Sequence, residues 1–172
     1  MAVKDLGTFI EYRDLPLVRS KFRGQVIVFV SGAFDLLHAA HVAFFEKCKK
    51  LGDILVVEVA HDALIRKNKG EGRPILNEQA RLKMVGSLRV VDFCFLDVPV
   101  EGYPLAFLGT VMELLKPDKY VINTDAWDIP YRRELAQKHG VELVISERSL
   151  IPGHGDLSTS DIIEKIRSLP HG

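Results

Sequence analysis

Two histidines that follow a buried-type strand are the side chains in this sequence best placed to do chemistry. The apolar, β-branched residues 26–31 lead into Gly32, and His38 and His41 come shortly afterwards, just before a helical pattern over residues 42–51. A strand, a turn and a helix in this order bring backbone N–H groups and both imidazoles to one helix N-terminus, where anions bind. We therefore interpret this stretch as a phosphate site suited to a nucleoside triphosphate. Packing of both imidazoles against the sheet is the plainer alternative.

Five apolar stretches predict the sheet that must position these histidines. The first two have the nearly continuous apolar character of a parallel strand covered on both faces, and helical patterns lie between the five stretches. The alternation predicts an α/β protein, with a Rossmann-like, doubly wound five-stranded parallel sheet and helices on both faces. The expected strands cover residues 26–31, 54–60, 90–96, 119–122 and 142–146.

The chain divides into a short lead-in and one domain. Residues 1–24 are weakly patterned, except for a short helix predicted after Asp14, where a proline follows in the first turn. Residues 25–172 carry the alternation of strands and helices and form the domain. Within it, residues 61–69 are polar and basic, and residues 70–74 form a glycine-rich loop.

The composition excludes several classes of protein. The 172 residues are 47% hydrophobic and 27% charged, and 23 basic residues balance 23 acidic ones, so we expect neither a nucleic acid nor a membrane as partner. No signal-peptide core and no apolar run of about 20 residues is present, which favours the cytoplasm. Cys48 and Cys94 lie far apart in the sequence and are predicted to be buried thiols.

Further polar residues follow the strands at the edge of the sheet where ligands of such folds bind. Lys67, Lys69 and Arg73 form a basic cluster in the expected loop, and they are either solvated or phosphate ligands. Asp125 and Trp127 follow the fourth strand. In a structural interpretation, Asp125 is a turn residue and Trp127 is a core residue. In a functional interpretation, Asp125 supplies a carboxylate for the ribose or the base, and Trp127 supplies an aromatic ring for stacking.

Two more positions have both a structural and a functional interpretation. Ser158, Thr159 and Asp161 open the last helix, and the serine and the aspartate fit a capping box. The same helix N-terminus can also hold an anion. Asp35 either caps the helix that begins near His38 or orients one of the histidines.

The motifs that are missing restrict the chemistry. The sequence contains no Walker A pattern, no G-x-G-x-x-G and no G-x-S-x-G, and no nucleophile stands beside a base. No third ligand of matching spacing follows the histidine pair, so we predict no metal held by protein side chains. The expected chemistry is direct displacement at phosphorus, driven by positioning and charge stabilisation.

At these residues the sequence resembles the cytidylyltransferase-like nucleotidyltransferases. Their first signature, G-x-F-D-x-x-H-x-G-H, stands here as GAFDLLHAAH over residues 32–41. Their second signature, near [IL]-S-T-[ST], stands as LSTS over residues 157–160. The loop 69–74 and Arg81 look like the connecting loop and the following helix of the family.

The resemblance implies a nucleotidyltransferase domain over residues 25–172. Such a domain transfers a nucleoside monophosphate from CTP or ATP to a small phosphorylated alcohol or sugar and releases pyrophosphate. Mg²⁺ accompanies the triphosphate, held largely by phosphate oxygens, and members are commonly homodimers.

The resemblance also implies roles for individual residues. The two histidines, His38 and His41, stabilise charge at the α-phosphate, and Lys69 holds phosphates. Nucleotide binding is implied for Gly32, Ala33, Phe34, Asp125, Ser158 and Thr159. Further candidates for binding the acceptor or a phosphate are Asp35, Asp62, Arg73, Arg81, Trp127 and Arg148.

One departure from the first signature affects the functional interpretation. Ala40 replaces a glycine where the backbone is expected to lie close to the nucleotide. A nucleotide-binding regulatory module without turnover is therefore the alternative to an enzyme. The sequences of residues 34–38 and of the loop 69–74 most resemble those of the sugar-phosphate (heptose) adenylyltransferase branch. The architecture fits equally the branch that makes CDP-alcohol products.

Overall fold

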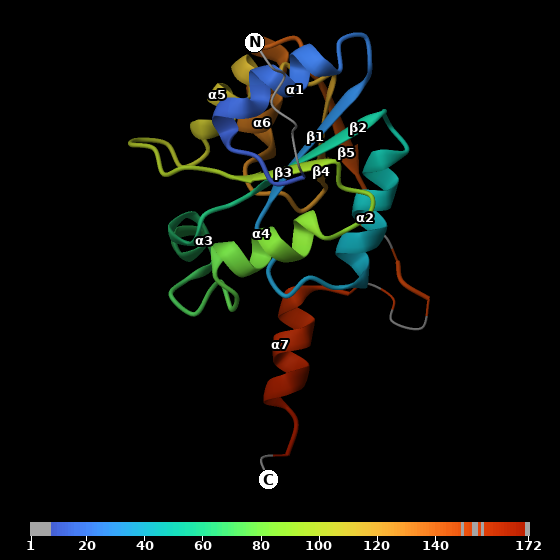
Figure 1. The fold of residues 1–172 in the computed structure, drawn as a ribbon. Coiled ribbons are helices and arrows are strands. Elements are labelled where there is room, and N and C mark those ends of the chain that lie inside the picture. Colours follow the sequence, from blue (N-terminus) through green and yellow to red (C-terminus); the bar gives the residue numbers. More distant parts are fainter. Residues whose placement is uncertain (1–7, 149, 153–154, 156, 171–172) are drawn as a thin grey trace.

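The computed structural model describes residues 8–148, 150–152, 155 and 157–170, and it confirms the predicted fold class (Figure 1). Five strands form one parallel sheet in the order β3-β2-β1-β4-β5. The strand order reverses between β1 and β4, which is the doubly wound arrangement. The strands are β1 (Ile27–Gly32), β2 (Ile54–Val59), β3 (Phe93–Leu96), β4 (Lys119–Asn123) and β5 (Glu142–Ser146).

Helices cover both faces of the sheet. The first face packs against α1 (Leu15–Lys21), α5 (Phe107–Leu115) and α6 (Ile129–Lys138), and the opposite face packs against α2 (Ala39–Lys49) and α4 (Glu78–Gly86). Side chains alternate between the two faces along each strand. Ile27 and Phe29 accordingly join the first core cluster, whereas Val28 and Val30 join the second.

The stretch before the sheet belongs to the same core. Residues 12–14 form a 3₁₀ turn, and α1 starts directly after Asp14, as predicted. Leu15 and Val18 of α1 are fully buried in the cluster beneath α5. Residues 1–7 of the predicted lead-in lie outside the described residues. Both predicted buried thiols are confirmed, since Cys48 and Cys94 are fully buried.

One helix was missed by the sequence reasoning. Residues 62–69 form α3 (Asp62–Lys69), so Lys67 and Lys69 lie in its last turn and not in a loop. His61 caps this helix, because its Nδ1 accepts a hydrogen bond from the Leu64 amide at 3.0 Å. Leu64 and Ile65 pack on Ala60. The helix fixes the direction in which its last residues face the sheet edge.

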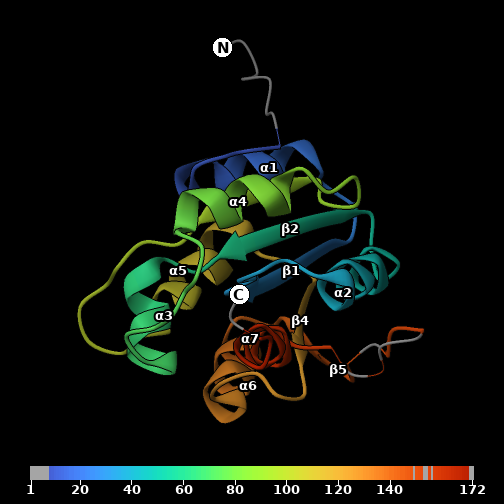
Figure 2. The ribbon, with the colours of Figure 1, turned by 90° about the horizontal axis from the view of Figure 1, so that it is seen from below.

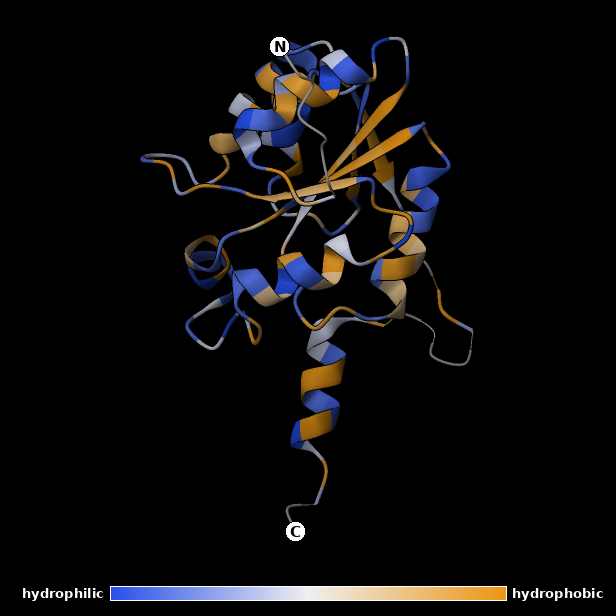
Figure 3. Cartoon of the chain, viewed as in Figure 1, coloured by the Kyte–Doolittle hydropathy of each residue, from blue (hydrophilic) through white to orange (hydrophobic). Residues whose placement is uncertain are grey.

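The last helix, α7 (Thr159–Arg167), begins at the carboxyl edge of the sheet and projects away from it (Figure 1). Figure 2, seen from below, shows α7 end-on beneath the strands. Figure 3 shows hydrophobic strands inside the molecule and a mixed hydropathy along α7, of which no described residue is buried. Among the described residues, no helix has the length and apolar character needed to cross a bilayer.

Candidate functional site

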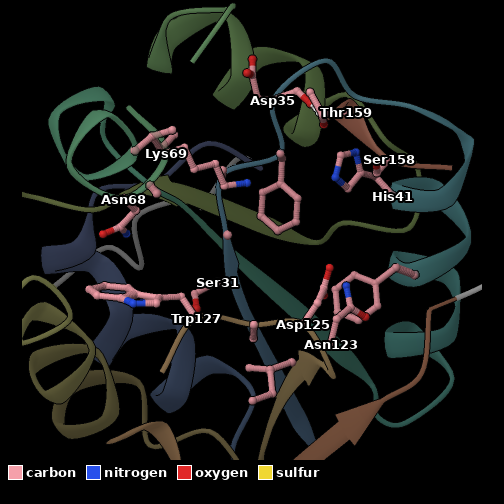
Figure 4. Close-up of a pocket in the computed structure, with 18 of the residues that line it drawn as sticks. Ser31, Asp35, His41, Asn68, Lys69, Asn123, Asp125, Trp127, Ser158 and Thr159 are labelled. Atoms are coloured by element: carbon pink, nitrogen blue, oxygen red, sulfur yellow. Dashed lines mark hydrogen bonds between the residues drawn. The ribbon is translucent and has the colours of Figure 1, made fainter. Parts of the chain in front are cut away.

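A pocket of about 420 Å³ lies at the carboxyl edge of the sheet, beside the point where the strand order reverses (Figure 4). Its size is that of a small-molecule site. Residues far apart in the sequence converge here, from the ends of β1, β2, β4 and β5 and from the start of α7. The sequence-predicted residues that line it are Gly32, Ala33, Phe34, Asp35, His38, His41, Lys69, Arg73, Asp125, Trp127, Arg148, Ser158 and Thr159.

The histidine pair opens α2. The two rings stack, with centroids 3.9 Å apart and an interplanar angle of 23°. The backbone N–H of His38 donates to Nδ1 of His41 at 3.4 Å, so the neutral His41 ring carries its proton on Nε2. Both residues line the pocket, as the i, i+3 spacing predicted.

The electrostatics of the pair keep it uncharged. Burial lowers the pKa of His41 to about 3, and His38, Lys69 and Arg148 push it in the same direction. Burial and Arg148 also lower the pKa of His38. At neutral pH both imidazoles are therefore neutral groups whose N–H can donate to a phosphate oxygen.

Gly32 and Phe34 shape the wall beside the histidines. Phe34 adopts a left-handed backbone (φ 49°), and its ring folds back over Gly32. A Cβ on Gly32 would lie 2.8 Å from the ring carbon Cζ of Phe34, which is why a glycine is required. The ring then meets His41 edge-on at 5.7 Å and Phe45 at 4.9 Å. The glycine thus lets Phe34 support His41.

Within the described part of the chain, Asp35 neither caps α2 nor hydrogen-bonds a histidine. Its buried carboxylate accepts hydrogen bonds from the amides of Ile75 and Leu76 and from Nε of Arg73. Burial opposes ionisation, but these donors lower the pKa of Asp35 on balance. Its carbonyl oxygen accepts a hydrogen bond from Thr159 at 2.7 Å. Asp35 therefore ties the loop before α4 and the start of α7 to the histidine turn.

Lys69 reaches the pocket from the end of α3. Partial burial and the neighbouring Arg73 lower its pKa, although the side chain keeps contact with solvent. Across the pocket, Arg148 pairs with Asp125 at 3.6 Å (Figure 4 labels Lys69 and Asp125). Lys69, Arg73 and Arg148 thus bring three cationic side chains to the region of the histidines, which suits an anionic ligand.

The predicted capping box at α7 is confirmed. Ser158 accepts from the Asp161 amide at 3.2 Å, and Asp161 accepts from the Ser158 amide at 2.8 Å. The helix N-terminus points toward the pocket, and Ser158 and Thr159 line it. Backbone N–H groups at this end are oriented to meet an anion.

Two predicted residues are placed elsewhere. Arg81 is fully buried and donates to the carbonyl oxygens of Ala33, Ala60 and Leu76, and also to Asp62. Neither Arg81 nor Asp62 is among the described residues that line the pocket. All three guanidinium nitrogens of Arg81 donate to backbone carbonyl oxygens or to Asp62, so we interpret Arg81 as a structural residue. It holds the strand ends together beneath the site.

Sequence reasoning missed several polar lining residues, among them Ser31, Glu58 and Arg132. Glu58 lies inside an expected strand that is otherwise apolar, and this single charged residue could have indicated a functional position. Arg132 lies on α6, and an arginine inside a predicted helix carries no signal that separates a pocket residue from an exposed one.

Four buried side-chain nitrogen or oxygen atoms have no hydrogen-bond partner within the described part of the chain. They are Nδ1 of His38, Oε2 of Glu58, Nη2 of Arg73 and Oδ1 of Asn123. All four belong to residues that line the same pocket. Because buried polar atoms are nearly always partnered in folded proteins, this concentration points to a polar ligand.

The donor set bears on the expected Mg²⁺. The described residues contain no cluster of three or more His, Cys, Asp or Glu side chains that could hold a metal ion by themselves. Asp35 is engaged by backbone amides, and Asp125 pairs with Arg148. The residues present fit a Mg²⁺ ion only as a companion of phosphate oxygens.

Fold and site together define an α/β protein of the doubly wound class, with a histidine pair in the pocket at the carboxyl edge of its sheet. The sequence profile of the cytidylyltransferase-like family matches residues 29–165. The chain belongs to the cytidylyltransferase-like family, and this membership makes it a nucleotidyltransferase domain.

Individual relatives agree with this assignment. The chain is 37% identical to the bifunctional protein HldE of Citrifermentans bemidjiense and 35% identical to that of Pelobacter propionicus, over 96% of this chain in each case. These matches cover 32% and 33% of the relatives, so the chain spans about a third of their length.

Solved structures show the same fold. A lipopolysaccharide core biosynthesis protein from Thermoplasma volcanium is 35% identical, with a TM-score of 0.58 over 73% of this chain and 98% of that one. The pantoate-β-alanine ligase of Francisella tularensis is 16% identical, with a TM-score of 0.63 over 94% of this chain and 77% of the ligase, and shares the fold alone.

Proposed function

We propose that this domain transfers a nucleoside monophosphate from ATP to a sugar phosphate and releases pyrophosphate. The observation that carries the proposal is the pocket itself. A pair of neutral histidines, three cationic side chains and a helix N-terminus surround one cavity, and four unpartnered buried polar atoms line it. This arrangement suits a triphosphate that meets a second phosphorylated substrate.

The proposed chemistry is one displacement. A phosphate oxygen of the acceptor attacks the α-phosphorus, the bond from the α-phosphorus to its bridging oxygen breaks, and pyrophosphate leaves with the electron pair. The N–H groups of His38 and His41 donate to the α-phosphate oxygens, where negative charge grows in the transition state. Lys69 and the N-terminus of α7 neutralise the leaving pyrophosphate.

Two comparisons favour a sugar phosphate over a simpler phosphorylated alcohol. One solved relative at 35% identity is described as a lipopolysaccharide core biosynthesis protein, and lipopolysaccharide cores are carbohydrate. The curated relatives share the name HldE. Both agree with the sequence resemblance to the heptose adenylyltransferase branch, which supports ATP as the donor.

Further parts of the proposal follow from the resemblance. Mg²⁺ would be held by phosphate oxygens and would supply positive charge to the triphosphate. The protein would act as a homodimer in the cytoplasm. Sedimentation at micromolar concentration tests the dimer, and removal of Mg²⁺ with a chelator, which should stop turnover and leave the fold intact, tests the cofactor.

The test of the function is a matrix of substrates. The protein is incubated with Mg²⁺, one of the four nucleoside triphosphates, and one of several sugar 1-phosphates or phosphorylated alcohols, and pyrophosphate is measured. We expect release with ATP and a sugar phosphate. Release only with CTP and a phosphorylated alcohol would assign the protein to the other branch. Tight ATP binding without product from any acceptor would make it a non-catalytic module.

A further inference from the structure

Glu58 is a carboxylate in a place where carboxylates are rarely found. It lies in β2, whose six residues are all buried, and it is only 4% exposed. Its Oε2 has no hydrogen-bond partner among the described residues, yet the residue lines the pocket. A buried polar atom left unpartnered costs stability, so its retention indicates that something else binds to it.

The strand register shows on which side of the sheet Glu58 lies. It is the neighbour of Ser31 in the β1–β2 ladder. It follows Ile54 and Val56 in steps of two, and both of these pack in the core beneath α5 and α6. Glu58 therefore faces α5 and α6, whereas the histidines open α2 on the opposite face.

A fixed cation and two hydroxyls stand near Glu58. Arg132 of α6 is buried and donates to the hydroxyl oxygens of both Ser31 and Tyr120, and these two hydroxyls are 2.7 Å apart. Nε of Arg132 donates to the carbonyl oxygen of Trp127 at 2.7 Å. The guanidinium is thereby held in one position, and it attracts the Glu58 carboxylate.

Three of these residues, Ser31, Glu58 and Arg132, line the pocket on this face of the sheet, in a part that we call the α5/α6 chamber. Trp127 also lines the pocket. It is 43% exposed, and its ring stacks on that of Tyr103 with centroids 6.1 Å apart (Figure 4 labels Ser31 and Trp127). An exposed aromatic face beside convergent polar groups suits the ring of a hydroxylated ligand. The chamber consists of Ser31, Glu58, Leu105, Leu108, Ile122 and Arg132.

The protonation state of Glu58 matches such a ligand. Burial raises its pKa well above the ordinary value, and the neighbouring Asp97 adds to the effect, while Arg132 opposes it. A protonated carboxyl can both donate and accept a hydrogen bond. It is therefore a suitable partner for a sugar hydroxyl, which also does both.

We propose that the α5/α6 chamber binds the hydroxylated body of the acceptor and that Glu58 selects for it. The inference rests on the proposed function, because it assigns one end of the same pocket to the second substrate. An acceptor held here would direct its phosphate across the strand ends, past Gly32, toward the histidines. The nucleotide would occupy the opposite end of the pocket, at α2 and α7.

The test compares two substitutions at Glu58. Glu58→Gln keeps a group that donates and accepts, whereas Glu58→Leu removes both abilities at similar volume. Glu113→Leu, an exposed glutamate on α5 outside the pocket lining, is the matched control. Isothermal titration calorimetry gives the dissociation constants of each variant for ATP and for the tightest of three hexose 1-phosphates, those of mannose, glucose and galactose.

We expect Glu58→Leu to weaken the binding of the sugar phosphate by about tenfold or more and to leave ATP affinity within about twofold. Glu58→Gln should stay within about threefold of the wild type for both ligands. The melting temperature of Glu58→Leu should equal or exceed that of the wild type, because the substitution removes a buried polar atom that has no hydrogen-bond partner within the described part of the chain. A structural role for Glu58 would instead lower it.

Three results would overturn the inference: unchanged sugar-phosphate affinity in Glu58→Leu, an equal loss for ATP, or no binding of any of the three sugar phosphates by the wild-type protein. The proposed function is judged separately by pyrophosphate release. If the protein releases pyrophosphate but Glu58→Leu binds the sugar phosphate as the wild type does, only the inference about Glu58 is refuted. If Glu58→Leu weakens the binding of the sugar phosphate but the wild-type protein releases no pyrophosphate, only the proposed function is refuted.

Discussion

The depressed pKa of His41 makes the stability of the protein depend on pH in a way that one substitution should remove. The pKa is about 3 in the folded protein and 6.5 in the unfolded chain. As the pH falls below 6.5, the unfolded chain takes up a proton that the folded protein refuses, so stability is lost between roughly pH 6.5 and pH 3.

The size of the loss follows from the two pKa values. Between pH 8 and pH 5 the unfolded chain gains a proton over about 1.5 pH units, which corresponds to about 2 kcal/mol of unfolding free energy. Asparagine at this position keeps an oxygen that can accept from the His38 amide but does not titrate. His41→Asn should therefore lose about 2 kcal/mol less than the wild type over this range.

Urea denaturation at pH 8 and at pH 5, followed by circular dichroism, measures the effect. Groups that both proteins retain, including His38 and Glu58, cancel in the comparison. Gln137→Asn, which introduces the same residue at an exposed position of α6 outside the pocket lining, should reproduce the wild-type loss. Equal pH sensitivity of the wild type and His41→Asn would refute the claim that His41 is held neutral by its burial.

Three further substitutions, the first with a matched control, separate catalytic from structural residues. Lys69→Met should lower the rate of pyrophosphate release by about 10²–10³-fold with little change in urea stability. The control Lys67→Met, two residues earlier in α3 and outside the described pocket lining, should leave both unchanged. Gly32→Ala should cost about 1–3 kcal/mol in the same denaturation assay and slow turnover, because its Cβ collides with a ring at 2.8 Å. Arg81→Leu should cost about 3–5 kcal/mol by leaving Asp62 and three carbonyl oxygens without their donor, and a near-neutral result would contradict the structural role.

The sequence predicted the fold well because its signals are local. Five apolar runs specified the strands, and the spacing between them required crossover connections, so the parallel sheet followed. The helix α3 was not predicted, because it is short and has only two buried residues, Leu64 and Ile65. Its polar and basic composition resembles that of a loop.

The candidate site was predicted in part. The histidine pair and the start of α7 were found because each opens a helix after a strand and belongs to a recognisable pattern, and Lys69 was found as part of a basic cluster. The separation of Arg81 from the pocket could not be predicted, because an arginine in an amphipathic helix has the same local pattern whether it faces a ligand or a backbone turn. The role of Asp35 likewise depends on Ile75 and Leu76, which are distant in sequence.

The α5/α6 chamber illustrates the same limit. Ser31, Glu58 and Arg132 come from three separate elements, and only the register of β1 on β2 and the packing of α6 bring them together. Glu58 alone carries a sequence signal, a charge within an apolar strand. Its meaning depends on which face of the sheet the charge occupies, and the sequence does not specify what covers that face.

The most direct test of the central claim is the rate of pyrophosphate release by His41→Ala under single-turnover conditions, with ATP and the sugar phosphate that the substrate matrix identifies. The account predicts a fall of about 10²-fold or more relative to the wild type and to Lys67→Met, with ATP affinity and urea stability at pH 8 largely retained. A wild-type rate in His41→Ala would contradict the account, because the histidine pair would then have no part in the displacement at phosphorus.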